Sequence, residues 1–246
     1  MSALLDVRDL HVRYGSYEAV KGVSFTLEEG GILGIVGESG SGKSTIAKTL
    51  MGLERPSAGV VAFQTGRPRK EAVQMIFQDA VGSLNPRMTT RQTLEEVIRL
   101  KGGRTAGSGR GVCAAGRSVA RLLDLVGLSA AVLDQYPREM SGGQCQRVSI
   151  ARALACAPEV LIADEPVSAL DVSVQARILN LLRDLRRELG LSILLIAHDL
   201  AVVKNVCDRI CVMARGRFVD AGDAEAVFAH PSSDYTKRLL SAVPRI

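Results

Sequence analysis

The residues best suited to chemistry form a glycine-rich stretch, GESGSGKST, which ends in a lysine and two hydroxyl residues. It fits the pattern G-x-x-x-x-G-K-[ST], follows an apolar run and leads into a helical pattern, as a phosphate-binding loop does. Glycines let successive backbone N–H groups converge on phosphate oxygens, and the following helix N-terminus adds a positive dipole end. We expect this phosphate loop to comprise Gly37, Glu38, Ser39, Gly40, Ser41, Gly42, Lys43, Ser44 and Thr45.

Two side chains of the phosphate loop have distinct predicted tasks. Lys43 would reach the β- and γ-phosphates of a nucleotide, and the Ser44 hydroxyl would be a ligand of Mg²⁺. The alternative is a chance turn of glycine and serine, which the lysine and the strand-to-helix context disfavour.

Acidic residues close a second apolar run, VLIAD. Asp164 stands at the carboxyl end of a predicted strand, where a phosphate-loop protein places its Mg²⁺ partner. Glu165 follows and can orient or deprotonate an attacking water, an effect of about 10²–10⁴-fold. Alone, the pair would be read as an acidic loop end, but beside a phosphate loop it indicates hydrolysis.

A histidine follows a third apolar run, SILLIA. His198 would lie at the sheet edge where ligands bind, and it could donate a hydrogen bond to a γ-phosphate or hold the water. His11 and His230 lack such a setting and are interpreted as structural.

A second glycine-rich stretch, MSGGQ at residues 140–144, is here termed the signature segment. Ser141 and Gln144 form a capping box for the helix that follows. Gly142 and Gly143 do not suit a plain cap, because each costs up to about 1 kcal/mol relative to alanine inside a helix. Two glycines at a helix start form a surface that an anion can approach, although no lysine accompanies them.

Hydrophobic periodicity places these groups on a mostly parallel α/β framework. Strands are predicted over 4–14, 19–31, 31–37, 160–164, 192–198, 209–214 and 218–222, with a turn at 215–217. Helices are predicted from Lys43 to near Gly52 and over 91–100, 118–128 and 172–190. The last carries an apolar stripe of Val174, Ile178, Leu182, Leu185 and Leu189. Residues 79–89 are interpreted as a loop, and the glycine-rich 101–111 as a flexible connector.

Composition narrows the class of protein. The 246 residues are 47% hydrophobic and 23% charged with a net charge of +5, typical of a soluble globular chain and without a basic, aromatic nucleic-acid motif. Five cysteines without a C-x-x-C pair argue for a reducing compartment, and Cys207 and Cys211 are interpreted as core thiols. We predict no signal peptide and no membrane-spanning run, so a membrane role would need a partner.

The order of these motifs resembles the ATP-binding-cassette (ABC) ATPases over essentially the whole chain. The sequence GESGSGKST resembles the Walker A motif, VLIADE the Walker B with its glutamate, and MSGGQ the family signature. IFQD resembles the Q-loop with Gln78, SALD the D-loop with Asp171, and IAHD the switch with His198. VRYG is similar to the A-loop, which makes Tyr14 the adenine-stacking residue and Tyr17 the second candidate.

The resemblance implies a fold, cofactors and a division of the chain. The fold is an α/β P-loop (RecA-like) core with a mostly parallel sheet, an N-terminal antiparallel β part and an inserted helical subdomain. Residues 1–78 and 158–246 would form the nucleotide-binding core, and 79–157 the helical subdomain that carries the signature. ATP is the implied substrate, with Mg²⁺ held by Ser44, Gln78 and Asp164.

The resemblance also implies a second subunit. Two such domains pair head to tail, so Ser141, Gly142, Gly143 and Gln144 of one would close over ATP on the phosphate loop of the other. Gln78 would report occupancy to a membrane partner, and Asp171 would couple the two sites. The partner would be a paralogue or a second copy.

Four segments narrow the resemblance to ATPases of oligopeptide, dipeptide and nickel importers: QMIFQDAVGSLNPRMT, SGGQCQR, DEPVSALDVSVQARILNLL and HPSSDYTKRLLSAVP. Ala80 departs from this pattern, which has proline there, and the middle block is shortened. The implied protein is a peripheral ATPase on the cytoplasmic face of a membrane that energises uptake of peptides or a nickel or metal chelate through separate permeases. An external binding protein would feed the permeases.

Three alternatives remain open. A soluble ABC ATPase acting on nucleic acid or ribosomes usually has two cassettes or a coiled-coil insertion, and neither is evident in this sequence. An accessory cassette of a phosphonate-breakdown assembly resembles the same subgroup, but SLNPRMT after Gln78 favours the importer. A degenerate binding module is disfavoured because every catalytic position is filled.

Overall fold

The computed structural model describes residues 3–102, 118–168 and 170–241. The chain forms two compact units, one of residues 1–64 with 192–246 and one of 65–191, and each is described separately. These boundaries separate the two compactly packed parts of the chain and do not test the functional division. The division at 78/79 and 157/158 therefore stays a prediction.

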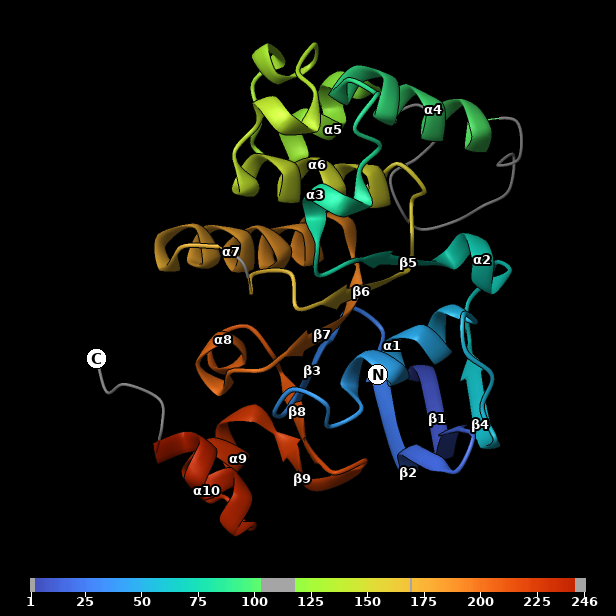
Figure 1. The fold of residues 1–246 in the computed structure, drawn as a ribbon, viewed down its shortest axis with the longest axis vertical. Coiled ribbons are helices and arrows are strands. Elements are labelled where there is room, and N and C mark those ends of the chain that lie inside the picture. The colour runs from blue at the N-terminus through green and yellow to red at the C-terminus, as the bar shows by residue number, and fades with distance from the viewer. Residues whose placement is uncertain (1–2, 103–117, 169, 242–246) are drawn as a thin grey trace. The chain divides into compact units, whose positions relative to one another are not determined.

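The first unit contains two groups of strands (Figure 1). The strands are β1 (Ala3–Tyr14), β2 (Tyr17–Glu28), β3 (Ile32–Val36), β4 (Ala58–Phe63), β7 (Ser192–Ala197), β8 (Arg209–Ala214) and β9 (Arg217–Asp223). Its helices are α1 (Lys43–Met51), α8 (Leu200–Lys204), α9 (Ala224–Ala229) and α10 (Asp234–Ser241). Strands β2, β1 and β4 form an antiparallel sheet, while β7, β3 and β8 are parallel neighbours and β9 pairs antiparallel with β8.

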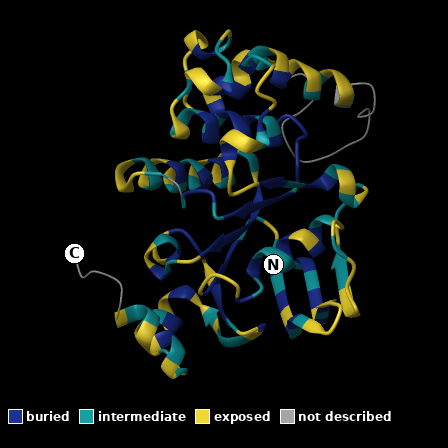
Figure 2. Ribbon diagram, viewed as in Figure 1, coloured by how far each residue is buried: buried dark blue, intermediate teal, exposed yellow. Residues whose placement is uncertain are grey.

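The strands that lead to the site are continuous apolar runs, and the structure buries them. Every residue of β3 and β7 is buried, as Figure 2 shows in dark blue, because parallel strands are covered on both faces. In their register Val36 lies opposite Ala197, so the phosphate loop and His198 leave neighbouring strands at the same edge. The predicted turn at 215–217 lies between β8 and β9 and uses positive φ at Arg215 and Gly216.

The second unit is mainly helical, with one parallel strand pair. Its strands are β5 (Val73–Ile76) and β6 (Val160–Asp164), and its helices are α2 (Arg69–Ala72), α3 (Ala80–Ser83), α4 (Thr90–Gly102), α5 (Val119–Leu125), α6 (Gly142–Leu154) and α7 (Val172–Leu189), with single 3₁₀ turns η2 (Ala130–Val132) and η3 (Pro137–Glu139). Helix α6 packs against α3, α4, α5 and α7. The predicted stripe of α7 is confirmed, since Ile178, Leu182 and Leu185 are buried, and Gly190 ends the helix with a φ of 66°.

One expectation about local structure is corrected. Residues 79–89 are not loop throughout, because Asp79 caps the one-turn helix α3 by accepting from the Gly82 N–H at 2.8 Å. Ala80 is the first residue of that helix, a position that also suits proline, so the departure from the subgroup pattern fits the backbone.

The two cysteines predicted to be core thiols lie before and within β8. Cys207 lies in the turn before β8 and Cys211 lies within β8, so the two are not on a helix. Both are buried, and burial raises their thiol pKa values, that of Cys211 to about 12. Within the described ranges no cluster of three or more His, Cys, Asp or Glu could hold a metal ion.

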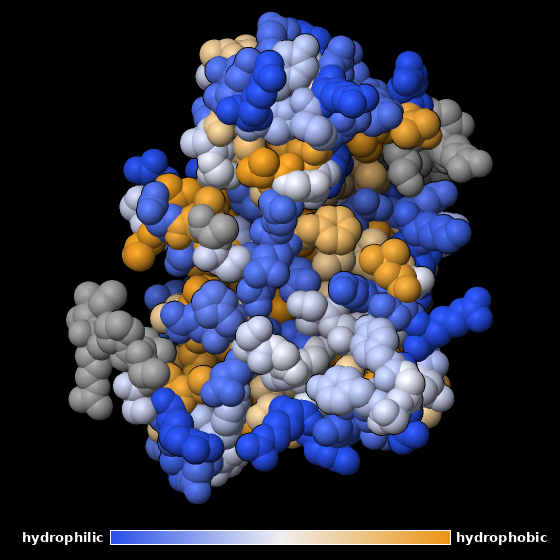
Figure 3. Space-filling view, in the orientation of Figure 1, coloured by the Kyte–Doolittle hydropathy of each residue, from blue (hydrophilic) through white to orange (hydrophobic). Residues whose placement is uncertain are grey.

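The visible face of the molecule is mostly hydrophilic, with apolar residues in scattered groups (Figure 3). Among the described residues no helix combines the length and apolar character needed to cross a membrane.

Candidate functional site

The phosphate loop joins the end of β3 to the start of α1 in the first unit. An idealised Cβ on Gly37 would lie 2.1 Å from the Met213 carbonyl oxygen, and one on Gly42 would lie 2.5 Å from that of Ala19. Gly42 also has a φ of 113°, which side chains rarely adopt. These two glycines are therefore required by the neighbouring backbone of β2 and β8, which hold the loop in shape.

Lys43 is folded back into the loop that it closes. Its side chain is buried, and its Nζ donates to the carbonyl oxygens of Gly37 at 2.7 Å and Glu38 at 2.9 Å. The ammonium group is thus held within the loop by the loop's own carbonyl oxygens. Ser41, also buried, has a hydroxyl with no hydrogen-bond partner within the described ranges.

Tyr14 ends β1 and lies beside the first turn of α1. Partial burial is the main cause that raises the pKa of its phenol, and the nearby Thr45 and Glu54 side chains also act on that pKa. Tyr14 is 42% exposed as a whole residue, so it is accessible to a stacking partner. Tyr17 is more exposed and lies on the opposite strand of the hairpin, paired with Tyr14.

His198 directly follows β7 and is exposed, as its predicted role requires. The next residue, Asp199, caps α8 by accepting from the Ala201 N–H at 2.8 Å. This cap fixes the turn that presents His198 beside the strand end from which the phosphate loop departs.

In the second unit the Q-loop glutamine meets the predicted base. Strands β5 and β6 pair with Ile76 opposite Ala163, so Gln78 and Glu165 each lie two residues past that pair. The Gln78 Nε2 donates to Glu165 Oε2 at 3.0 Å. Asp164, the last residue of β6, is buried at the same strand end.

The backbone of Glu165 is unusual, with a φ of 46° in a residue that is not glycine. Such a conformation costs roughly 1–3 kcal/mol and is concentrated at functional sites. The Glu165 carbonyl oxygen accepts from the N–H and the hydroxyl of Ser168, which closes the turn and holds this conformation.

The signature segment forms the predicted capping box at the start of α6. The Ser141 Oγ accepts from the Gln144 N–H at 3.3 Å, and the Gln144 Oε1 accepts from the Ser141 N–H at 2.8 Å. The glycines also have a packing reason that the sequence did not reveal. An idealised Cβ on Gly143 would lie 2.8 Å from a Val174 methyl, and one on Gly142 would lie 3.3 Å from a Leu170 methyl.

Asp171 and Cys145 flank this region. Asp171 is the exposed N-cap residue of α7, and its side chain makes no capping hydrogen bond. Ala169 of the same D-loop lies outside the described residues. Cys145 is buried, its Sγ donates to the Pro137 carbonyl oxygen at 3.4 Å, and burial raises its pKa. The thiol is therefore a packing group.

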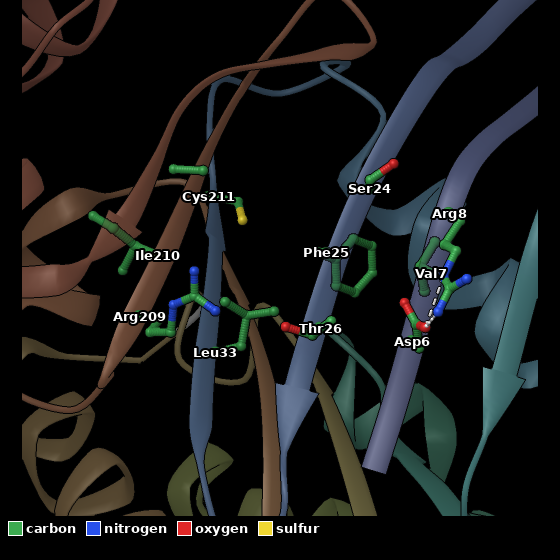
Figure 4. Close-up of a pocket in the computed structure, with 11 residues that line it drawn as sticks. Asp6, Val7, Arg8, Ser24, Phe25, Thr26, Leu33, Arg209, Ile210 and Cys211 are labelled. Atoms are coloured by element: carbon green, nitrogen blue, oxygen red, sulfur yellow. Dashed lines mark hydrogen bonds and ion pairs between the residues drawn. The ribbon is translucent and has the colours of Figure 1, made fainter. Parts of the chain in front are cut away.

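A separate cavity of about 260 Å³ in the first unit holds none of the predicted site residues (Figure 4). It lies among β1, β2, β3, β8 and β9, with Phe25 and Leu33 among its lining, and at its rim Arg8 pairs with Asp6 at 2.6 Å. Nothing in its lining resembles the nucleotide chemistry predicted above.

A phosphate loop between a buried parallel strand and a helix, with an acidic strand end in the same chain, defines the class of P-loop nucleotide-binding α/β proteins. Residues 20–168 match the family model described as ABC transporter. The chain therefore belongs to the ABC transporter family, and it is an ABC ATPase.

Relatives along the whole chain agree with this assignment. The oligopeptide transport ATP-binding protein OppF of Lactococcus lactis subsp. lactis (strain IL1403) is 44% identical over 267 residues, which cover 100% of this chain and 82% of that protein. The structure of cbiO1 from Clostridium perfringens, part of the ABC transporter complex cbiONQ, has a TM-score of 0.79 at 29% identity and covers 94% of this chain and 92% of its own. The ATP-binding cassette MJ0796, in a dimeric post-hydrolysis state bound to ADP and Pi, has a TM-score of 0.72 at 28% identity, covering 89% and 98%.

Proposed function

We propose that this chain is the ATP-hydrolysing subunit of an importer that takes up peptides, with nickel or a metal chelate as the alternative cargo. The observation that carries the proposal is the 44% identity with an oligopeptide transport ATP-binding protein over 100% of the chain. The site geometry gives each part of the reaction a candidate residue.

Nucleotide binding falls to the first unit. The backbone of residues 37–45 surrounds the phosphates, and Lys43 moves from the loop's carbonyl oxygens to the β- and γ-phosphates. The buried hydroxyl of Ser41, which has no hydrogen-bond partner among the described residues, and the helix start at Lys43 suit an anion. Tyr14 provides the exposed ring on which adenine stacks.

Magnesium would be held by Ser44, Gln78 and Asp164, whose oxygen atoms are the hard donors that this ion prefers. When bound, it would neutralise charge on the β- and γ-phosphate oxygens.

Hydrolysis uses the carboxylate at the end of β6. Glu165 takes the proton of the attacking water, and the bond from Gln78 to Oε2 orients the carboxylate. His198 donates a hydrogen bond to the γ-phosphate. Because Gln78 and Glu165 are hydrogen-bonded, a movement of the Q-loop changes the position of the proposed base, and a movement of the base is passed to the Q-loop.

A second ATPase subunit completes each site. The exposed Ser141 and the first N–H groups of α6 belong to a segment, MSGGQ, that contains no lysine or arginine, so they act on ATP bound to the partner subunit, whether paralogue or second copy. Asp171 couples the two sites. The pair sits peripherally on the cytoplasmic face of the membrane against separate permease subunits.

The proposal is tested by affinity purification of tagged Glu165→Gln chain from detergent-solubilised membranes with ATP present. Integral permeases should co-purify, and the wild-type complex in vesicles should accumulate labelled peptide only with ATP and an external binding protein. Nickel uptake without peptide uptake would move the cargo to the alternative. Recovery only with soluble enzymes or ribosomes would refute the importer.

A further inference from the structure

A tyrosine near the C-terminal end of the described chain touches the phosphate loop. The Glu38 N–H donates to the phenol oxygen of Tyr235 at 3.1 Å, across 197 positions of sequence. Lys43 donates to the Gly37 carbonyl oxygen at 2.7 Å. The Gly37 carbonyl and the Glu38 N–H belong to one peptide unit, so both of its polar groups are held, one by each side chain.

The start of α10, the helix that carries Tyr235, is held by hydrogen bonds. Asp220 of β9 accepts from the backbone N–H groups of Ser232 at 3.3 Å and Ser233 at 3.0 Å, and also from the Ser232 hydroxyl. Thr236, fully buried, donates its N–H to the Ser233 Oγ at 3.0 Å. These bonds tie the first turn of α10 to β9, the strand beside which Figure 1 shows it.

Open space lies beside the Tyr235 side chain. The ring is half-buried and borders a cavity of about 950 Å³ that is also lined by residues 38–41 and by Arg238 and Leu239. Because open space adjoins the contact, removal of the hydroxyl would free the peptide on its N–H side without disturbing a packed core.

We propose that Tyr235 is a positioning residue for the phosphate loop, and that α10 thereby sets the affinity of the chain for nucleotide. This rests on the proposed function of residues 37–45 as the phosphate site. When a phosphate draws Lys43 away from the Gly37 carbonyl oxygen, Tyr235 is the side chain that still holds the first peptide of the loop. The hydroxyl acts on binding, because the group that it holds, the Glu38 N–H, belongs to the phosphate loop.

The test compares full-length Tyr235→Phe with wild type and with Lys237→Ala. Lys237 lies on the same helix and is exposed, and among the described residues its side chain pairs with Asp234 of α10, so its variant controls for changes in the helix itself. Equilibrium binding of ATP and ADP is measured by titration calorimetry, and amide hydrogen exchange is followed in the peptide spanning 36–42. In the assembled complex KM for ATP and kcat are measured separately.

Loss of one neutral hydrogen bond should raise the Kd for nucleotide about 2- to 10-fold. Exchange at residues 37–40 should accelerate, KM should rise by a similar factor, and kcat and the melting temperature should stay unchanged. Asp220→Asn weakens the hydrogen bonds at the start of α10 but keeps the Tyr235 phenol, so it should also raise the Kd, by a smaller factor. Wild-type affinity and wild-type loop exchange in Tyr235→Phe would overturn the inference.

Lys43→Ala separates this inference from the proposed function. If Lys43→Ala loses nucleotide while Tyr235→Phe matches wild type, the phosphate site stands and only the role of Tyr235 is refuted. If Lys43→Ala binds as wild type does, the phosphate site is wrong, and the role of Tyr235 is refuted with it.

Discussion

The phosphate loop and the signature segment are both glycine-rich helix starts, yet they are built in opposite ways. Gly37 and Gly42 are required by backbone carbonyl oxygens of neighbouring strands, whereas Gly142 and Gly143 make room for the side chains of Leu170 and Val174. The first region encloses a buried lysine, and the second is an exposed cap. The difference fits our proposal that the first region binds an anion by itself and the second completes a site on a partner subunit.

The largest expected effect separates hydrolysis from binding. Glu165→Gln should lower turnover by about 10²–10⁴-fold, because the amide cannot accept the proton of the attacking water, while ATP binding is retained. A phosphate-release assay and nucleotide titration measure the two quantities. Glu188→Gln, an exposed carboxylate on α7 of the same unit, is the control and should match wild type. Fast turnover in Glu165→Gln would assign the base elsewhere.

The next substitution tests the signature segment. Ser141→Arg should reduce hydrolysis by the assembled pair about 10²–10³-fold, as loss of an oriented anion contact does, but leave ATP binding by the isolated chain nearly intact. Ser118→Arg is the matched control, because the Ser118 Oγ caps α5 in the same way and accepts a hydrogen bond from a backbone N–H at 3.1 Å. If Ser141→Arg also abolished binding by the isolated chain, the two regions would not be complementary halves.

A substitution in the phosphate loop should have the opposite effect and weaken ATP binding by the isolated chain. Lys43→Ala should weaken ATP binding by the isolated chain about 10- to 100-fold, since hydrogen bonds to charged groups contribute roughly 1.5–3 kcal/mol. Lys48→Ala removes an exposed lysine from the same helix and should have no effect. Equal affinities for the two variants, measured by calorimetry, would contradict the assignment of the phosphate loop.

The smallest effect sharpens the contrast between the glycines. Gly42→Ala should destabilise the fold by about 2–5 kcal/mol, because a positive φ and a backbone clash combine. Gly143→Ala should cost only about 0–2 kcal/mol, since alanine's helix propensity offsets the crowding of Val174. Urea unfolding of the two variants gives the difference. Similar losses would remove the distinction between backbone-enforced and side-chain-enforced glycines.

Sequence patterns predicted the structural features that depend on residues close together in the chain. The phosphate loop, the capping box at Ser141, the stripe of α7 and the apolar strands β3, β6 and β7 are set by neighbouring residues, and the structure places them as predicted. Strands β4 and β5 were not predicted individually. Helix α3 was missed because the Asp79 cap stabilises a single turn that is too short to show periodicity.

The remaining features depend on contacts that no local pattern encodes. The bond from Gln78 to Glu165 joins residues 87 positions apart, and the bond from Glu38 to Tyr235 joins residues 197 apart. The packing reason for Gly143 lies in Val174, on another helix. The sequence indicated that Glu165 does chemistry, but its positive φ emerges only from the turn closed by Ser168.

The carboxylate that anchors α10 has a consequence for proton linkage. Burial tends to raise the pKa of Asp220, but hydrogen bonds from Ser232, Thr236 and Ser233 outweigh it and lower the pKa to about 2. A carboxylate whose pKa falls on folding contributes stability that is complete above its unfolded pKa near 4 and is lost as pH falls towards 2. The anchoring of α10 is therefore indifferent to acidity over the whole range in which histidines titrate.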